Sequence, residues 1–196
     1  MIRNKKKNQL IKYESEKNKS IIFRIITQDT FLHIVALIFI GILLSIHLKN
    51  IEIVGTHDGG LHLKRIYYTI YSLKQGYFPP LISPLLCNNF GYSMNIFYQP
   101  IVTYVPMIFS YITQSISIGL KYYACFTIVA SGITMYFLGR KITKSNGVSF
   151  LIAFFYMIAP YKLLDIYVRY AIGEFTALVF VPLVFYGLYD LINENG

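Results

Sequence analysis

An uncharged apolar run close to the N-terminus constrains this chain more than any other feature. Residues 31–48 form a run of 18 residues that contains no Asp, Glu, Lys or Arg, and a helix of that length can cross the hydrocarbon core of a membrane. The composition agrees, because 55% of the residues are hydrophobic and only 14% are charged, whereas a soluble domain carries about 25% charged residues. The sequence therefore predicts an all-α, polytopic membrane protein.

Much of the positive charge lies ahead of this first span, in a basic tail over residues 1–30. The tail holds eight Lys and Arg against three acidic residues, in a chain of net charge +9. A basic tail beside a first span keeps the N-terminus in the cytoplasm and favours membrane lipids, rather than nucleic acid, as partners. Because no small-residue cleavage site follows the apolar run, we interpret it as an uncleaved membrane anchor.

Further apolar stretches predict additional spans and extend the transmembrane domain over residues 31–192. The semi-polar region 49–119 is predicted to be a long external loop. It contains an amphipathic helix over 58–75 and an aromatic, proline-rich loop over 76–100 that is suited to form an apolar wall for a lipid chain. A polar loop is predicted over 162–174. The later spans are predicted at about 120–138, 148–159 and 175–191.

The segment 99–119 leaves the number of spans open. It is apolar enough to cross the membrane, but it contains Pro100, Pro106 and several Ser, Thr and Gln residues. If it lies on the outer membrane surface as an interfacial helix, the chain has four spans, and if it crosses, the chain has five. Counting Lys and Arg on each side does not separate the two topologies, although the polar residues and prolines favour four.

The first polar cluster follows the first span. Asp58, His62 and Arg65 are spaced to share one face of a helix. A carboxylate there can act as a general base or ligate a divalent metal ion, and Arg65 and His62 can bind phosphate oxygens. The plainer alternative is a solvated first helical turn, in which Asp58 is favoured by the helix dipole. A zinc site that also includes His57 would lack a further ligand.

The second polar cluster surrounds the start of the last predicted span and contains Asp165, Arg169 and Glu174. Residues five apart do not meet on a helix, and Gly173 can interrupt one. We therefore expect no intrahelical salt bridge between Arg169 and Glu174. Instead, Glu174 is expected to face the same external cavity as Asp58, with Arg169 at the rim of that cavity, available to a phosphate. The alternative is a simple ion pair at the membrane interface.

Several kinds of chemistry have no support in the sequence. It contains no Walker loop, nucleophile elbow, HExxH motif or EF-hand. Its two cysteines, Cys87 and Cys125, lie in different predicted environments and have no metal-binding spacing. We expect them to be unlinked.

Short motifs outside the apolar runs carry a resemblance to a known family. After Asp58 come Gln-Gly-Tyr-Phe-Pro-Pro at 75–80, Asn-Phe-Gly-Tyr at 89–92 and Tyr-Gln-Pro at 98–100, and later Arg-Tyr-Ala-Ile-Gly-Glu-Phe-Thr-Ala at 169–177. These motifs resemble the bacterial "6-pyruvoyl-tetrahydropterin synthase-related" integral membrane family. The layout is in turn similar to that of polytopic, lipid-dependent glycosyltransferases of the GT-C type.

The resemblance implies a function and roles for the polar residues. It implies transfer of a sugar from a polyprenyl-phosphate carrier, with Asp58 as the catalytic base or metal ligand and Glu174, or with less weight Asp165, as the second catalytic acid group. From their charge and spacing, we expect His62, Arg65 and Arg169 to bind substrate near the phosphate. Asp58 and Glu174 lie on the same side of the membrane only in the four-span topology, which the resemblance therefore favours.

The length of the chain departs from this pattern, because GT-C transferases are much longer than 196 residues. We therefore expect the N-terminal, site-bearing part of such an enzyme, either as a truncated product or as one half of a split protein whose second chain supplies further spans. The rival hypothesis is a non-catalytic membrane subunit or lipid-binding scaffold, in which the polar residues are structural.

Overall fold

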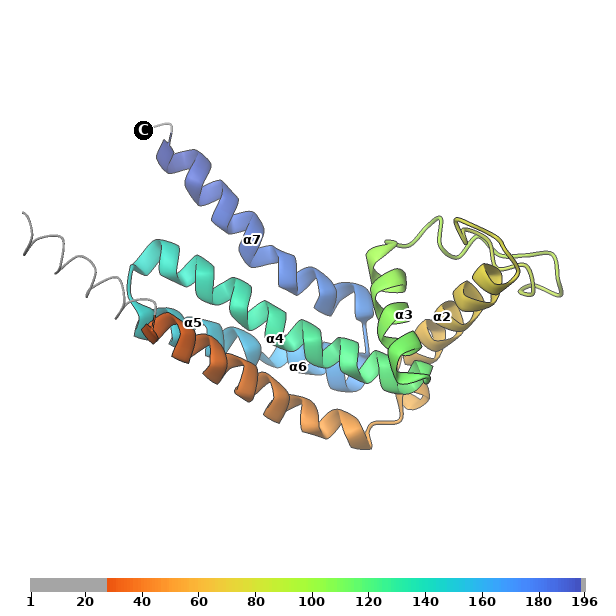
Figure 1. Ribbon diagram of the computed structural model, residues 1–196, viewed down its shortest axis with the longest axis horizontal. Helices are drawn as coiled ribbons and strands as arrows, with labels where there is room; N and C mark the ends of the chain where they lie inside the picture. Colours follow the sequence, from red (N-terminus) through yellow and green to blue (C-terminus); the bar gives the residue numbers. More distant parts are fainter. Residues whose placement is uncertain (1–27, 195–196) are drawn as a thin grey trace, which may run out of the picture. The chain divides into compact units, whose positions relative to one another are not determined.

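The computed structural model of the protein describes residues 28–194. Most of the predicted basic tail, residues 1–27, lies outside the described residues. The secondary structure of the described residues is helical, with no β-strand beyond an isolated bridge between Ser83 and Tyr92, and a long irregular segment lies between α2 and α3. The predicted all-α fold is confirmed (Figure 1).

The first predicted span is a helix, Gln28–Asn50. Its last turn tightens into a 3₁₀-helix, η1 (Ile46–Asn50), and a second short 3₁₀-helix, η2 (Ile53–Gly55), follows. The N-terminal helix packs closely against a later one at Gly41, where an added Cβ would lie 2.5 Å from Val129 Cγ2. Only a residue without a side chain allows this approach.

Two helices lie in the predicted external loop. The amphipathic helix α2 (Gly59–Lys74) buries one face and ends just before Gly76, whose φ of +85° suits glycine. The second helix, α3 (Ile101–Thr113), has 13 residues. The irregular segment between them is attached to α2 by Asn95, whose amide nitrogen Nδ2 donates to Thr69 Oγ1 at 2.9 Å.

The second predicted span is the long helix α4 (Ile116–Thr143), and α5 (Asn146–Met157) returns along it. Each helix is capped at its N-terminus by a serine, Ser115 for α4 and Ser145 for α5. The hydroxyl of each serine accepts a hydrogen bond from a backbone N–H of the first turn. Small residues let the two helices approach each other. An added Cβ at Gly132 would lie 2.4 Å from Met157 Sδ.

The predicted polar loop over 162–174 is wrong, because most of it is helical. The segment α6 (Pro160–Leu164) continues into a π-helical turn, η3 (Asp165–Arg169). Pro160 does not end the helical region but begins α6, at a position where its missing N–H costs nothing. The axis of this segment is bent by 42° from that of α5.

The last helix, α7 (Ile172–Glu194), runs in the same direction as α4. Near the start of both, the hydroxyls of Tyr123 and Thr176 are 2.7 Å apart. Near the end of both, Lys141 Nζ lies 2.5 Å from Asp190 Oδ1. The chain therefore returns, through α5, α6 and η3, to the end of the bundle where α4 begins.

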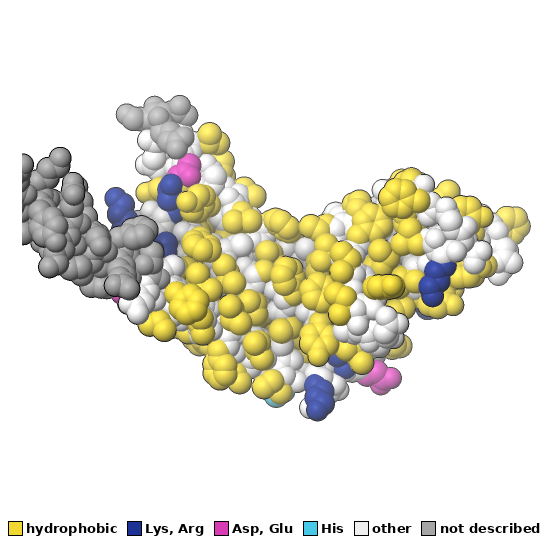
Figure 2. Space-filling view, viewed as in Figure 1, with side chains coloured by type: hydrophobic (Ala, Val, Ile, Leu, Met, Phe, Trp, Pro, Cys, Tyr) yellow, Lys and Arg dark blue, Asp and Glu magenta, His cyan; other side chains and the backbone are white. Residues whose placement is uncertain are grey.

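Three of the described helices are long and apolar enough to cross a membrane, namely the N-terminal helix, α4 and α7, and the bent pair of α5 with α6–η3 would make a fourth. On the face drawn in Figure 2, hydrophobic side chains cover the middle of the bundle and charged side chains lie towards its ends. The prediction of an integral membrane protein is confirmed. The start of α4 lies beside the end of the N-terminal helix, because Lys121 Nζ donates to the carbonyl oxygen of Lys49 at 3.0 Å.

Candidate functional site

The first cluster meets the second through the backbone. The N–H of Asp58 donates to the carbonyl oxygen of Arg169 at 2.8 Å, and the N–H of His57 donates to that of Val168 at 3.4 Å. The start of α2 is therefore fixed against the end of η3, although more than a hundred residues separate them in the chain. This contact brings the two sequence-predicted clusters to one end of the helical bundle.

The carboxylate of Asp58 is not used for helix capping. Asp58 occupies the N-cap position of α2 but makes no side-chain cap hydrogen bond. The hydroxyl of Thr56 instead accepts the N–H of Gly59 at 3.2 Å. Asp58 is half-buried and takes part in none of the ion pairs found within residues 28–194. Its side chain is therefore in a position to serve as a base or a ligand.

His62 and Arg65 are buried on the inner face of α2, with exposed fractions of 3% and 6%. Arg65 Nη1 donates to His62 Nδ1 at 3.1 Å. Burial, and secondarily the charge of Arg65, lowers the pKa of His62 to about 3. His62 is therefore neutral at physiological pH, with Nδ1 as the acceptor, and it orients the guanidinium.

Tyr98 covers the guanidinium of Arg65, which sequence reasoning did not anticipate. Arg65 Cζ lies 3.7 Å from the centroid of the Tyr98 ring, a cation–π contact. Burial lowers the pKa of Arg65, while the Tyr98 hydroxyl acts in the opposite direction. The only sequence signal for Tyr98 was its place in the Tyr-Gln-Pro motif, to which no role had been assigned.

Arg65 has no acidic partner among the described residues. It is absent from the ion pairs, and its buried Nε atom makes no hydrogen bond. Asn95, which is linked to the Arg65 carbonyl through Thr69, also has a buried Oδ1 atom without a hydrogen bond. A buried cation without a counter-charge is unfavourable. The surroundings of Arg65 are therefore complementary to an anion.

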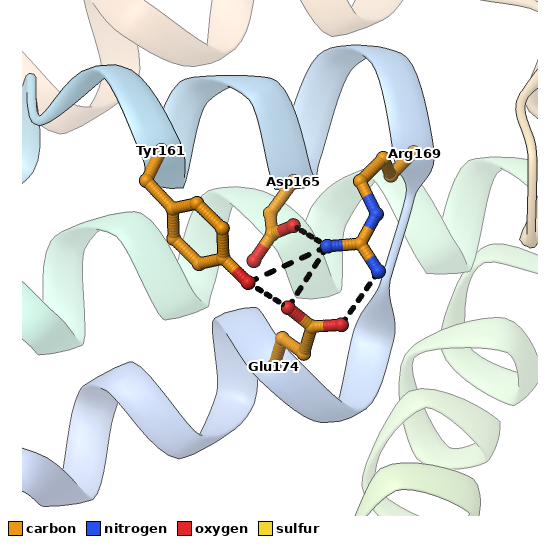
Figure 3. A network of polar contacts seen from close by, with 4 residues as sticks. All are labelled: Tyr161, Asp165, Arg169 and Glu174. Carbon is orange, nitrogen blue, oxygen red and sulfur yellow. Dashed lines mark hydrogen bonds and ion pairs between the residues drawn. The ribbon is translucent and has the colours of Figure 1, made fainter.

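The second cluster is a compact polar network (Figure 3). Arg169 and Glu174 form two hydrogen bonds, from Nη2 to Oε1 at 2.7 Å and from Nη1 to Oε2 at 2.9 Å. Arg169 Nη1 also donates to Asp165 Oδ1 at 2.7 Å. The hydroxyl of Tyr161 donates to Glu174 Oε2. A single guanidinium thus holds two carboxylates.

This ion pair joins two helices instead of lying within one. Arg169 ends η3, Tyr170 adopts a left-handed conformation with φ of 54°, and Glu174 lies in the first turn of α7. Arg169 was predicted to lie at a rim, available to a phosphate; its side chain is 30% exposed, and its guanidinium contacts the carboxylates of Asp165 and Glu174. Asp165, given less weight from sequence, has a fully buried side chain whose Oδ2 atom makes no hydrogen bond.

Tyr98 also connects the Arg65 cluster to the start of α7. A Cβ added at Gly173 would lie 2.8 Å from the Tyr98 hydroxyl oxygen, so only glycine leaves room for that hydroxyl. Gly173 immediately precedes Glu174. An apolar cavity of about 360 Å³ adjoins this point, between Gln99 at the start of α3 and Phe180 on α7. All the predicted site residues therefore lie at one end of the bundle.

Protein ligands for a metal ion are few. Within residues 28–194, no three His, Cys, Asp or Glu side chains converge as a metal site. A divalent ion at Asp58 would take its other ligands from phosphate or water, which is how Mg²⁺ is commonly held. Both cysteines are free, Cys87 exposed and Cys125 half-buried.

Comparison with known proteins gives one relative. No protein-family profile and no solved structure matches the chain. A protein of Lactococcus lactis subsp. cremoris, strain MG1363, described as uncharacterized, is 26% identical over 166 residues, which is 83% of this chain and 27% of the relative. The chain thus spans about a quarter of the length of the curated relative that it matches.

Proposed function

We propose that this chain is the N-terminal, site-bearing part of a GT-C-like membrane glycosyltransferase that uses a sugar linked to a polyprenyl phosphate. The observation that carries the proposal is the buried Arg65, which has no acidic partner among the described residues and lies at the same end of the bundle as Asp58. The proposed transfer requires two groups, a cation that can bind the phosphate and a carboxylate that is free to act as a base. Arg65 and Asp58 are these two groups.

The roles follow from the chemistry of transfer. An acceptor hydroxyl attacks the anomeric carbon of the sugar while Asp58, as the general base, accepts its proton. Were a divalent ion bound, Asp58 would help to hold it, and the ion would polarise the reacting oxygen atoms. The bond between that carbon and the phosphate oxygen breaks, and its electron pair stays on the polyprenyl phosphate. Arg65, oriented by neutral His62, stabilises the negative charge that develops on the phosphate.

Glu174 is the proposed second acidic group, and Arg169 positions it. The bidentate contact fixes the carboxylate of Glu174 at the junction of η3 and α7. The half-exposed side chain of Glu174 can reach a sugar bound beside Tyr98 and Gly173. To bind phosphate, Arg169 would first have to release the carboxylate of Asp165 or Glu174.

The proposed topology has four spans, with α2 and α3 at the outer membrane surface and the N-terminus in the cytoplasm. The contact between Lys121 and Lys49 supports it, because it brings both ends of the external region to one side. The length of α3 supports it too, since 13 residues rise only about 20 Å and the hydrocarbon core is about 30 Å thick. This topology places Asp58 and Glu174 outside the cytoplasm.

A non-catalytic lipid-binding subunit is the second candidate. It is favoured by the state of Arg169, whose guanidinium is occupied by Asp165 and Glu174 as in a structural ion pair. In that case the anion at Arg65 is a lipid phosphate that is held and not turned over. A second chain that supplies further spans is compatible with both candidates.

Both candidate functions require Arg65 to bind a lipid phosphate. Binding of polyprenyl phosphate to the purified chain in detergent tests this requirement. We expect the ligand to raise the unfolding temperature of the wild type, and Arg65→Gln to weaken this binding about tenfold or more, as expected for a charge-assisted contact. Arg65→Lys should retain part of the binding. Lys64→Gln, on the exposed face of α2, is the matched control. Equal affinity of Arg65→Gln and wild type would contradict the proposal.

Sugar transfer then separates the two candidates. Membranes that contain the chain, together with any co-expressed partner chain, are supplied with a polyprenyl-phosphate sugar, and release of the polyprenyl phosphate is measured. Release that depends on Asp58 identifies the enzyme. Binding without any release identifies the lipid-binding subunit.

A further inference from the structure

A second cavity lies between the N-terminal helix and α4, away from the residues proposed for transfer. Its volume is about 490 Å³, within the range of about 300–1,000 Å³ typical of ligand pockets. Apolar side chains form its walls, with Ile42 and Ile46 on one helix and Ile118 and Tyr122 on the other. We call this cavity the α4 crevice.

Two lysines stand at the α4 crevice, where both helices approach the end of the bundle. Lys49 is exposed in the last turn of the N-terminal helix, and Lys121 is half-buried in the second turn of α4. Lys121 Nζ donates to the carbonyl oxygen of Lys49 at 3.0 Å, which uses one of its three donors and brings its charge towards Lys49. The crevice therefore has a cationic end and apolar walls.

No acidic side chain neutralises this pair within the described part of the chain. Neither lysine takes part in an ion pair there, and no Asp or Glu lines the crevice. The acidic residue nearest in sequence, Glu52, is exposed and also forms no ion pair among residues 28–194. The charge at the crevice is thus complementary to an anion that also has an apolar part.

We propose that the α4 crevice binds an anionic phospholipid, with its phosphate against Lys49 and Lys121 and an acyl chain between the N-terminal helix and α4. A basic side chain near a membrane surface favours an anionic lipid by about 1 kcal/mol, or about fivefold in affinity. Two lysines therefore prefer an anionic over a zwitterionic headgroup by about 25-fold. This site is independent of the proposed transferase function and uses none of its residues.

Cys125 provides a built-in probe, because it lines the crevice one helical turn beyond Lys121. The full chain is purified in a maltoside detergent with Cys87→Ser, which leaves Cys125 as its one thiol. The rate of Cys125 alkylation by N-ethylmaleimide is measured while phosphatidylglycerol or phosphatidylcholine is added. We expect phosphatidylglycerol to slow alkylation at about 25-fold lower mole fraction than phosphatidylcholine.

Charge variants show whether the lysines cause this preference. Lys49→Gln and Lys121→Gln should each reduce the preference about fivefold, and the double variant should abolish it. Lys121→Arg, which keeps the charge, should preserve it and shows that loss in Lys121→Gln is not a folding defect. The control is Lys64→Gln/Lys74→Gln, which removes two exposed lysines of α2 and should leave the preference unchanged.

Three outcomes would overturn the proposal. Equal protection by the two lipids would mean that the crevice has no charge preference. An unchanged preference in Lys49→Gln/Lys121→Gln would place the selectivity elsewhere. Protection by glycerol phosphate alone, which has no acyl chain, would identify a site for a soluble phosphate. Loss of phosphatidylglycerol from the purified double variant, measured by native mass spectrometry, is the independent supporting result.

Discussion

The backbone N–H of Asp58 and the carbonyl oxygen of Arg169 form a hydrogen bond of 2.8 Å. This bond holds the start of α2 at the end of η3, so that Asp58 lies beside the network of Arg169 and Glu174 without depending on its own side chain for its place. The carboxylate of Asp58 can therefore be changed without removing the contact that positions it.

Asp58→Asn should abolish sugar transfer while leaving the fold and membrane insertion intact. The side chain makes no cap hydrogen bond, so the change in unfolding free energy should remain below about 1 kcal/mol. Transfer activity in membranes and the unfolding temperature in detergent are the two measurements. Glu52→Gln, at a neighbouring exposed acid, is the control, and full activity of Asp58→Asn would rule out its catalytic role.

His62 should make the protein less stable in acid. Its pKa is about 3 in the folded chain and about 6.5 in the unfolded chain, so between these values only the unfolded chain binds the proton. Stability should therefore fall as the pH drops below 6.5, by at most about 2 kcal/mol between pH 6.5 and pH 5. The measurement is the unfolding temperature at pH 7 and pH 5. His62→Gln should lack this component, and an identical pH dependence would contradict the assignment.

Arg169→Gln should destabilise the junction of η3 and α7, because it leaves the carboxylates of Asp165 and Glu174 facing each other. Arg169 and Glu174 are partly exposed, whereas the side chain of Asp165 is fully buried and would lose its cationic partner. We expect a loss of about 1–3 kcal/mol. Thermal unfolding in detergent measures it. Arg169→Lys keeps the charge but not the bidentate geometry and should lose less. Adding Glu174→Gln to Arg169→Gln should recover part of the loss, and strict additivity would show that the two residues are not coupled.

Gly119→Ala should force α3 and α4 apart. A Cβ at Gly119 would lie 2.4 Å from both N and Cα of Ser110, and backbone atoms cannot move aside as a flexible side chain does. The expected loss is about 1–3 kcal/mol in thermal unfolding. Gly187→Ala in α7 is the matched control, since nothing lies within 4 Å of its added Cβ, and it should be neutral or stabilising. Tolerance of both substitutions would argue against the close contact.

Residues 115 and 145 should lie on opposite sides of the membrane. Ser115 and Ser145 are the N-cap residues of α4 and α5, so replacing each with Cys in a Cys-free chain perturbs the two helices alike. In intact spheroplasts, an impermeant thiol reagent should label residue 115 and leave residue 145 unlabelled. The reverse pattern would invert the proposed topology.

Hydrophobicity predicted the main helices but not their ends. The span predicted at 120–138 is the helix Ile116–Thr143, because the helix continues beyond the apolar run to its capping residues, Ser115 at the N-terminus and Lys144 at the C-terminus. The loop predicted over 162–174 was wrong for a related reason, because the prediction again followed hydrophobicity alone. Lys162 and Asp165 were taken as loop residues because they are charged, yet both are buried in α6 and η3.

The candidate site could be predicted only in part. The helical spacing of His62 and Arg65 correctly placed the two residues on one face of α2. The contact of Arg65 with Tyr98 could not be derived, because it depends on how an irregular loop folds back over α2. The same holds for Asp58 and Arg169, whose contact needs the whole bundle to bring distant segments together.

The buried guanidinium of Arg65 has a consequence for the protein outside any reaction. In the unfolded chain this cation is hydrated, whereas in the folded chain it is largely removed from water and has no acidic partner among the described residues. An anion that binds only the folded form therefore shifts the folding equilibrium in its favour by mass action. If the anion at Arg65 is the proposed lipid phosphate, the abundance of that lipid should influence how much of this protein persists in the membrane.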